Sequence, residues 1–212
     1  MAYDLEEQEQ LATIKAFWRQ YGSLLLTAVT VVLLAIAGWR GWGWHEARQA
    51  AGASGVYEQL QAAARDRDVD RIKATAGTLV GEYGRTAYAP MGALIAARVH
   101  VDAGDPKAAR PLLQWVIDKS PEEAMRHVAR VRLAGLLLDE QAYDEGLKLL
   151  AGSPPARFEA EWSDRRGDLL LAQGKTDEAR AEYRTALDKA RADAPMRRVI
   201  QLKLDALGGA AS

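Results

Sequence analysis

The histidines and the paired carboxylates are the side chains that could bind a metal ion or transfer a proton. They are His45, His100, His127, Glu122, Glu123, Glu159 and Glu161. The histidines show none of the spacings that zinc sites use, and such carboxylate pairs are common on solvated helices. No nucleotide-binding or nucleophile motif occurs, and the absence of cysteine excludes thiol chemistry. The sequence therefore predicts a non-enzymatic protein without a metal ion or cofactor.

Three aromatic residues in the C-terminal part of the chain have two interpretations. Tyr88, Trp115 and Trp162 lie in sequence of helical character, where aromatic rings most often fill a core. If one of them were exposed on a concave surface, it would be a candidate partner-binding residue, because aromatic side chains often anchor protein interfaces. The sequence leaves both interpretations open.

An uncharged run of twenty residues, from Gln20 to Trp39, is the longest apolar stretch of the chain. A helix of about 20 apolar residues crosses the hydrocarbon core of a bilayer. Aromatic residues flank the run, as they do at headgroup depth: Trp18, Tyr21, Trp39, Trp42 and Trp44. The sequence predicts an N-terminal segment at 1–19, a transmembrane helix with its interfacial tryptophans at 20–44, and a folded domain at 45–212.

A cleavable signal peptide and a buried core helix are the two alternatives to a membrane anchor. Ala35-Ile36-Ala37 offers a cleavage pattern, but the first fourteen residues carry four acidic side chains and no basic one, unlike a signal peptide. A buried core helix is rarely this long, uncharged and bracketed by tryptophan. Retention as an anchor is the favoured interpretation.

The sequence determines neither the orientation of the span in the membrane nor whether one face of the span binds a partner helix. Lys15 and Arg19 precede the span and Arg40 and Arg48 follow it, so that the count of flanking positive charges is a tie. The small and polar residues Thr27, Thr30 and Ala37 share one stripe of the helix. Such a stripe could bind a partner helix, or its hydroxyls could donate to the carbonyls of their own helix.

The remainder of the chain has the composition of a soluble all-α domain. It carries 25 basic and 25 acidic residues, so it lacks the electrostatic footprint of a nucleic-acid-binding protein. Alanine, leucine, arginine and glutamate dominate it, and valine and isoleucine recur at helical rather than alternating spacing. We expect helices throughout, with short breaks at glycine, proline and aspartate.

Equivalent packing positions recur at intervals that indicate repeated helical hairpins. Ile72, Ala109, Gly146 and Ala179 follow one another at intervals of 37, 37 and 33 residues, close to the 34-residue period of tetratricopeptide repeats. In the clearest hairpin, Gly167 allows a close helix crossing and Gly174 ends the first helix. We predict four helix pairs and a closing helix over 196–207. The alternative is a generic helical bundle with accidental spacing.

Four collinear segments of the chain resemble the YfgM family. They are the start from Tyr3 to Gly22, Gly38-Trp39-Arg40, the run from Arg166 to Lys175, and the ending from Gln201 to Leu207. Each segment is only moderately specific, but together and in order they are a strong match over nearly the whole chain.

The resemblance implies a bacterial inner-membrane protein with a cytoplasmic N-terminus and a periplasmic tetratricopeptide-like domain. It further implies an ancillary subunit of the SecYEG translocon that pairs with a PpiD-like periplasmic chaperone and assists translocating, unfolded polypeptides. No catalytic residue comes with the family. The alternative function is a static envelope scaffold that makes no contact with translocating chains.

Overall fold

The protein is described by a computed structural model, which covers the backbone of residues 3–208 and the side chains of residues 10–208. The predicted segments 1–19 and 45–212 therefore each include a few terminal residues outside the described ones. The side chains of the four N-terminal acids also lie outside the described ones. By their internal contacts, residues form two compact units, Met1–Gln49 and Ala50–Ser212. Within the described part the chain is helical and has no strand, which confirms the predicted all-α class.

Helix α1 (Tyr3–Asp66) contains the predicted membrane span and continues past it without a break. Among the described residues, the stretch Gln10–Asp66 of α1 is the one helix that is long and apolar enough to cross a membrane. Only 6% of the most apolar part of this stretch is buried within the protein. A core helix of a soluble domain would be mostly buried, so the exposure of this stretch argues against that alternative. The last part of α1, from residue 50 onward, belongs to the second unit.

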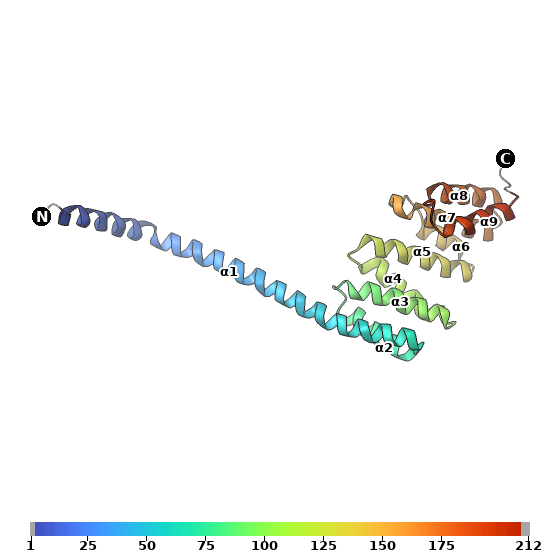
Figure 1. The fold of residues 1–212 in the computed structure, drawn as a ribbon, viewed down its shortest axis with the longest axis horizontal. Coiled ribbons are helices and arrows are strands. Elements are labelled where there is room, and N and C mark those ends of the chain that lie inside the picture. The colour runs from blue at the N-terminus through green and yellow to red at the C-terminus, as the bar shows by residue number, and fades with distance from the viewer. Residues whose placement is uncertain (1–2, 209–212) are drawn as a thin grey trace. The chain divides into compact units, whose positions relative to one another are not determined.

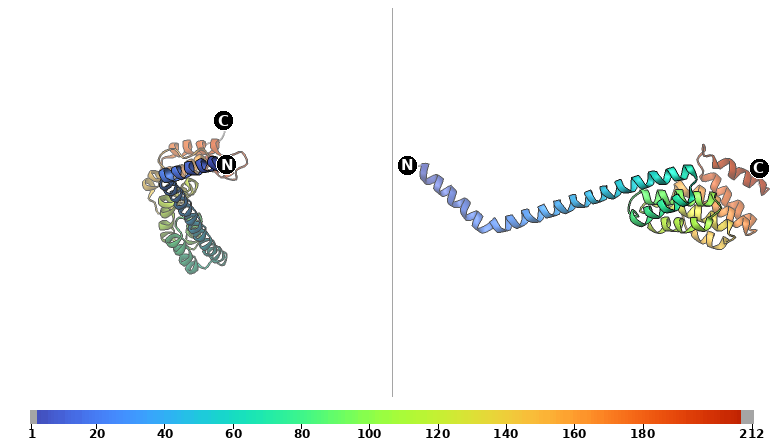
Figure 2. Two further views of the ribbon diagram at one scale, coloured as in Figure 1. Left: turned by 90° about the vertical axis from the view of Figure 1, so that its left-hand side faces the viewer. Right: turned by 90° about the horizontal axis from the view of Figure 1, so that it is seen from below.

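The second unit stacks its helices in chain order, from α2 at one end to α9 at the other (Figures 1 and 2). The helices after α1 are α2 (Val69–Glu82), α3 (Tyr88–Asp102), α4 (Pro106–Lys119), α5 (Glu123–Asp139), α6 (Tyr143–Leu149), α7 (Glu159–Ala172), α8 (Thr176–Lys189) and α9 (Met196–Ala206). A short 3-10 helix, Ala156–Phe158, leads into α7. Helix α5 contacts both α3 and α7, so the first helices of successive hairpins are neighbours.

The turns inside the hairpins repeat one backbone conformation. Arg67, Gly104, Gln141 and Gly174 have positive φ angles of 56°, 80°, 61° and 78°. These turn residues follow one another at intervals of 37, 37 and 33 residues. The packing positions Ile72, Ala109, Gly146 and Ala179 have the same intervals, because each lies five residues after a turn residue. Glycine adopts this left-handed conformation without steric cost. A residue in this conformation ends one helix, so that the next helix can pack back on it. The four predicted hairpins are therefore present and share one register.

Local capping explains where two of the second helices begin. The Asp68 carboxylate accepts a hydrogen bond of 3.0 Å from the backbone N–H of Arg71, and Asp105 accepts one of 3.1 Å from Ala108. Pro106 occupies the first turn of α4, where its missing N–H removes no helical hydrogen bond. These caps satisfy donors that a helix start leaves free.

Small residues of the predicted stripe lie where helices approach closely. Ala109 and Ala179 are fully buried. A Cβ atom on Gly146 would lie 2.8 Å from the Leu169 side chain, and one on Gly167 would lie 2.6 Å from the Tyr183 ring. Leu169 and Tyr183 thus fill the space that the two missing side chains leave.

Two further close approaches were not singled out from the sequence. A Cβ atom on Gly52 of α1 would meet the Tyr83 hydroxyl at 2.8 Å, and one on Gly92 of α3 would meet the Leu79 side chain at 2.4 Å. Gly52 belongs to the first hairpin and Gly92 to the second. They show that the close-packed register begins at the end of α1.

Helix α9 closes the solenoid as predicted, although only part of its apolar surface is covered. Ile200 and Leu204 are buried against α7 and α8 in the cluster that contains Tyr183. Val199 and Leu202 are 53% and 62% exposed. The helix therefore packs on the last hairpin through one face and leaves a second apolar face uncovered.

Candidate interaction surfaces

The aromatic residues that flank the apolar run are all exposed within their own unit. Their exposed fractions are 54% for Trp18, 44% for Tyr21, 85% for Trp39, 63% for Trp42 and 62% for Trp44. The Arg48 guanidinium lies 4.3 Å from the centre of the Trp44 ring, a cation–π geometry. Rings with one apolar body and one polar edge suit the boundary between lipid and water.

The two threonine hydroxyls in the predicted membrane span donate within the helix. Thr27 donates to the Ser23 carbonyl and Thr30 to the Leu26 carbonyl, each at 2.8 Å. This is the second of the two arrangements that the sequence left open. The two threonines therefore carry no unsatisfied hydroxyl for a partner helix, and the stripe offers a neighbour mainly its small size.

The histidines and paired carboxylates that could bind a metal ion or transfer a proton do not come together in one site. Among the residues with described side chains, no three histidines or carboxylates are grouped to hold a metal ion. His100 and His127 are buried, and the His127 ring packs against Phe158 and Trp162 with ring centres 5.0 and 5.4 Å apart. Glu123 and Glu159 lie on different helices. Glu123 contacts His127 at 3.4 Å, and Glu159 pairs with Lys189 at 2.7 Å.

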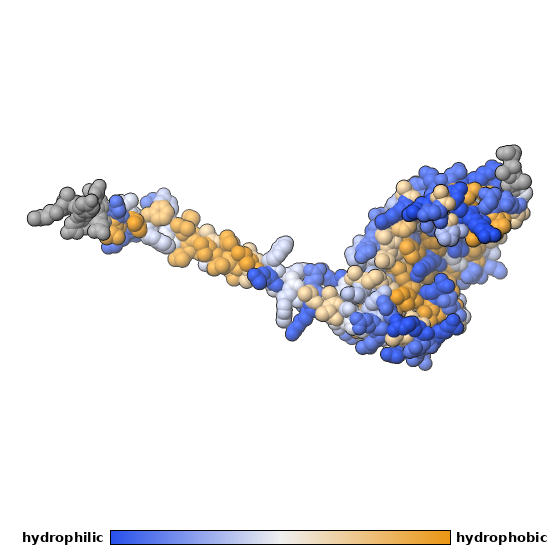
Figure 3. Space-filling model, viewed as in Figure 1, coloured by the Kyte–Doolittle hydropathy of each residue, from blue (hydrophilic) through white to orange (hydrophobic). Residues whose placement is uncertain are grey.

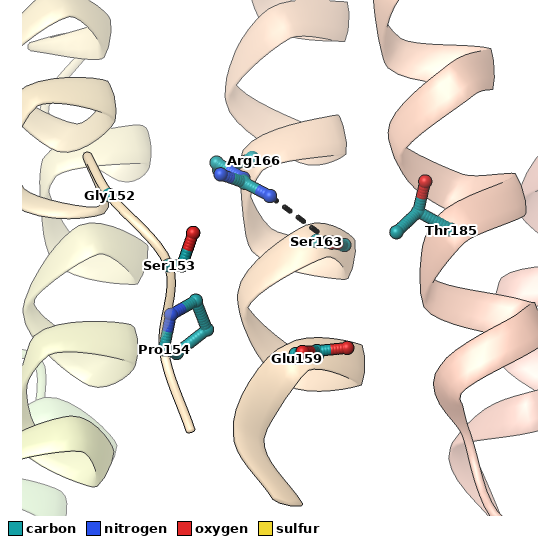
Figure 4. Close-up of a pocket in the computed structure, with 7 residues that line it drawn as sticks. All are labelled: Gly152, Ser153, Pro154, Glu159, Ser163, Arg166 and Thr185. Atoms are coloured by element: carbon teal, nitrogen blue, oxygen red, sulfur yellow. Dashed lines mark hydrogen bonds between the residues drawn. The ribbon is translucent and has the colours of Figure 1, made fainter. Parts of the chain in front are cut away.

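A small hollow of about 130 Å³ lies between the loop before α7 and helices α7 and α8 (Figure 4). It is lined by Gly152, Ser153, Pro154, Glu159, Ser163, Arg166 and Thr185. The Ser163 hydroxyl accepts from Arg166 at 3.3 Å, and Arg166 also pairs with Glu182 at 3.1 Å. Neither Ser153 nor Ser163 has a histidine beside it in this lining, so the hollow offers no activated nucleophile.

The three aromatic candidates for partner binding have different positions. Trp162 is 3% exposed and forms part of the core under α5 and α7, so its ring is not accessible to a partner. Tyr88 is half-buried beside Tyr57, with ring centres 5.5 Å apart. Trp115 is also half-buried and packs on the core clusters of the first two hairpins. A contact of Tyr88 or Trp115 with a partner stays a prediction.

The first helices of the hairpins share a surface that we call the inner face. It consists of the residues that lie nine and six positions before each hairpin turn, together with the equivalent residues of α9 before Gly208: Glu58, Gln61, Ile95, Arg98, Arg132, Gly135, Arg165, Asp168, Val199 and Leu202. Arg132 donates to the Leu94 carbonyl of the preceding first helix at 3.1 Å. The Arg165 guanidinium lies beside Gly135 of the preceding first helix, where an added Cβ atom would be 3.4 Å from it. Figure 3 shows a hollow over α5 in which apolar side chains gather, with hydrophilic side chains around it.

A polar cluster ties α9 to the last hairpin. Lys203 donates to Asp164 at 2.7 Å and to Asp168 at 2.6 Å, and the Tyr183 hydroxyl donates to Asp168 at 2.8 Å. Burial raises the pKa of Asp164 above its ordinary value, although Lys203 opposes that rise. Burial, and then the hydrogen bond to Asp168, raise the pKa of Tyr183 far above its ordinary value.

Sequence reasoning missed this cluster because its partners are distant in sequence. Lys203 lies in a different helix from both aspartates, and no motif links them. From the sequence, the Arg166–Gly167–Asp168 run was singled out for its glycine and for the family resemblance, and Asp168 was given no role. Equivalent positions on successive first helices would have placed Asp168 beside the closing helix.

The fold and its surfaces define a class: an all-α repeat protein of helical hairpins, whose described residues include one helix long and apolar enough to span a membrane. Residues 15–209 match the family described as tetratricopeptide repeat-like domain. No solved structure gives a significant match to the chain.

Curated relatives match the chain over nearly its whole length. A protein of Neisseria gonorrhoeae is 30% identical over 98% of this chain and 100% of its own. One of Escherichia coli is 29% identical over 95% and 96%, and one of Haemophilus influenzae is 27% identical over 88% and 91%. Each of the three is named ancillary SecYEG translocon subunit. The chain belongs to this tetratricopeptide repeat-like family, which confirms the resemblance to YfgM.

Proposed function

We propose that this protein is an ancillary subunit of the SecYEG translocon, anchored in the bacterial inner membrane by α1, that assists polypeptides emerging from the translocon. The observation that carries this proposal is the inner face, a stacked surface with an apolar hollow on a chain that also has a membrane-spanning helix. The names of the curated relatives support the translocon as the site of action. The protein acts as a binding module and not as an enzyme.

In this proposal, residues 1–19 lie in the cytoplasm and residues 45–212 in the periplasm, where the solenoid binds a PpiD-like chaperone. Solenoids of stacked hairpins bind helices or extended chains along their shared surface. A single-pass anchor keeps that surface at the membrane and raises its effective concentration there. The span itself has an exposed apolar surface and self-satisfied threonines, so it supplies proximity more than recognition.

The orientation is tested with a reporter enzyme that is active only after export. Fused after Ser212, the reporter should be active, because the solenoid is proposed to lie in the periplasm. The same reporter fused before the span should be inactive. The reverse pair of results would place the solenoid in the cytoplasm and remove its access to emerging chains.

A static scaffold is the second function to separate from this one. A precursor arrested during translocation should crosslink to the full-length protein, and this adduct should disappear when the precursor is released. A scaffold without a nascent-chain role would crosslink to the same fixed partners in both states. That outcome would remove the assisting function and leave the anchor and the solenoid intact.

A further inference from the structure

The stretch of α1 before the predicted membrane span has one apolar face, which we call the N-terminal stripe. Leu11, Ile14, Trp18 and Tyr21 follow one another at steps of three, four and three residues, and Phe17 lies beside them on the same face. Leu11, Ile14 and Phe17 are 53%, 55% and 50% exposed, close to the values for the other two. The Phe17 and Tyr21 rings pack on each other with their centres 5.2 Å apart. Five large apolar side chains thus face outward together.

The other sides of this stretch are polar or small. Lys15 and Arg19 lie four residues apart along one edge of the stripe, and both are exposed. Ala12, Ala16 and Gln20 occupy the opposite side. The predicted span, in contrast, carries large apolar side chains on all sides. A helix with one apolar face suits the boundary between lipid and water, whereas a helix that is apolar all round suits the hydrocarbon core.

The junction between the stripe and the span has features of a helix kink. Gly22 and Ser23 directly follow the stripe, and pairs of glycine and serine are a common cause of kinks. Figure 2 shows a bend in the blue part of α1, toward its N-terminal end. Gly22 is buried, and a Cβ atom on it would lie 2.9 Å from the Trp18 ring, so the missing side chain lets this ring lie against the helix backbone. A change of direction here allows the stripe to follow the membrane surface while the span crosses the bilayer.

We propose that residues 10–21 lie along the membrane surface, on the N-terminal side of the span, as an interfacial helix. The N-terminal stripe is buried by about 5–10 Å at the boundary of headgroups and acyl chains. Lys15 and Arg19 extend along the edge of the stripe toward the lipid phosphates. The inference rests on the proposed function, because it requires α1 to cross the membrane.

A lipid surface is the partner that this stretch fits best. The stripe continues directly into the span, so the membrane lies beside it wherever α1 is inserted. A lipid surface accepts any regular row of apolar side chains, whereas a protein groove requires a matching shape. The basic residues at the edge of the stripe also match phosphate headgroups, which a bilayer presents all along the helix.

The test measures the depth of spin labels in the full-length protein. The chain has no cysteine, so a single introduced cysteine carries the label at a chosen position. Ile14→Cys and Phe17→Cys place it in the stripe, and Ala12→Cys and Ala16→Cys place it on the opposite side. The protein is reconstituted into vesicles of phosphatidylethanolamine and phosphatidylglycerol, and the access of oxygen and of a water-soluble nickel complex to each label is measured.

The two sides of the helix should give opposite results. The labels at 14 and 17 should be reached by oxygen and protected from nickel, at a depth of about 5–10 Å. The labels at 12 and 16 should be reached by nickel, because they face water.

A charge placed in the stripe should lift this stretch off the membrane. Ile14→Glu should move the label at Phe17→Cys into water, because burial of a carboxylate among acyl chains is costly. Ala16→Glu adds the same charge on the opposite side and should leave the depth of that label unchanged. Circular dichroism melting of both variants shows that the solenoid is folded.

Three outcomes would overturn the inference. Nickel access at all four positions would mean that the stretch extends into water. Protection from nickel at all four positions, with access for oxygen, would mean that the span itself includes this stretch. Labels at 14 and 17 that neither reagent reaches would indicate a protein contact in place of lipid.

A label in the middle of the span separates this inference from the proposed function. Val29→Cys should place its label in the hydrocarbon core, out of reach of nickel. If that label lies in the core while the stripe lies in water, the interfacial helix is rejected and the membrane anchor stands. If the label at 29 lies in water as well, the anchor is rejected and the proposed function fails with it.

Discussion

Tyr183 takes part both in the helix packing and in the polar cluster of the last repeat. Its ring fills the space left by Gly167, and its hydroxyl donates to Asp168, which also accepts from Lys203. One side chain thus closes the α7–α8 crossing and joins the cluster that holds α9. A buried phenol with these partners resists ionisation, because the phenolate would be poorly solvated and would lie beside a carboxylate.

Alkaline titration tests this placement of Tyr183. Its folded-state pKa is raised above the unfolded value of about 10. The stability linked to its retained proton is therefore fully present below about pH 10 and is lost as the pH rises further. We expect the free energy of unfolding to fall more steeply above about pH 10 in the wild type than in Tyr183→Phe. Urea titrations at a series of pH values measure both slopes.

The native absorbance of the phenolate provides the control for this prediction. While the protein stays folded, the rise at the phenolate wavelength should be the same in the wild type and in Tyr183→Phe. A smaller rise in the variant would mean that Tyr183 ionises in the native state, contrary to its described surroundings.

At the scale of the helices, spacing in the sequence predicted the hairpins well because each repeat needs the same two features. A left-handed turn and, five residues later, a residue that packs at the helix crossing recur together through the stack, and this residue is small in every hairpin but the first. The contacts of Gly52 and Gly92 were not predictable in this way, because their large partners, Tyr83 and Leu79, lie in another helix. The burial of Trp162 also depends on how several helices meet around it.

A pair of glycine substitutions tests the helix-crossing argument. Gly167→Ala places a Cβ atom 2.6 Å from the Tyr183 ring, so we expect it to destabilise the second unit by about 1–3 kcal/mol. Gly77→Ala lies in the interior of α2 with open space around the new methyl group, and we expect it to stabilise by about 0.5–1 kcal/mol. Urea unfolding of both variants gives the two values. The same sign for both substitutions would show that intrinsic helix propensity, and not the crossing, decides their effect.

At the scale of the whole molecule, the proposed function divides two tasks between the two units. The exposed apolar run supplies the membrane anchor, and the solenoid supplies a surface with an apolar hollow and arginine side chains. The sequence alone predicted the span from length and lack of charge, since those properties are sufficient to cross a bilayer. It did not predict the contacts of Lys203 with Asp164 and Asp168, because these form only when α7 and α9 are placed side by side.

The central claim is that the inner face contacts polypeptides as they emerge from the translocon. A photo-crosslinking amino acid at position 202, where Leu202 is exposed on the uncovered face of α9, should give an adduct with an arrested precursor. The same amino acid at position 184 on the exposed surface of α8 should give little or none. Adducts with the precursor from position 184 but not from 202, or from neither, would contradict the claim.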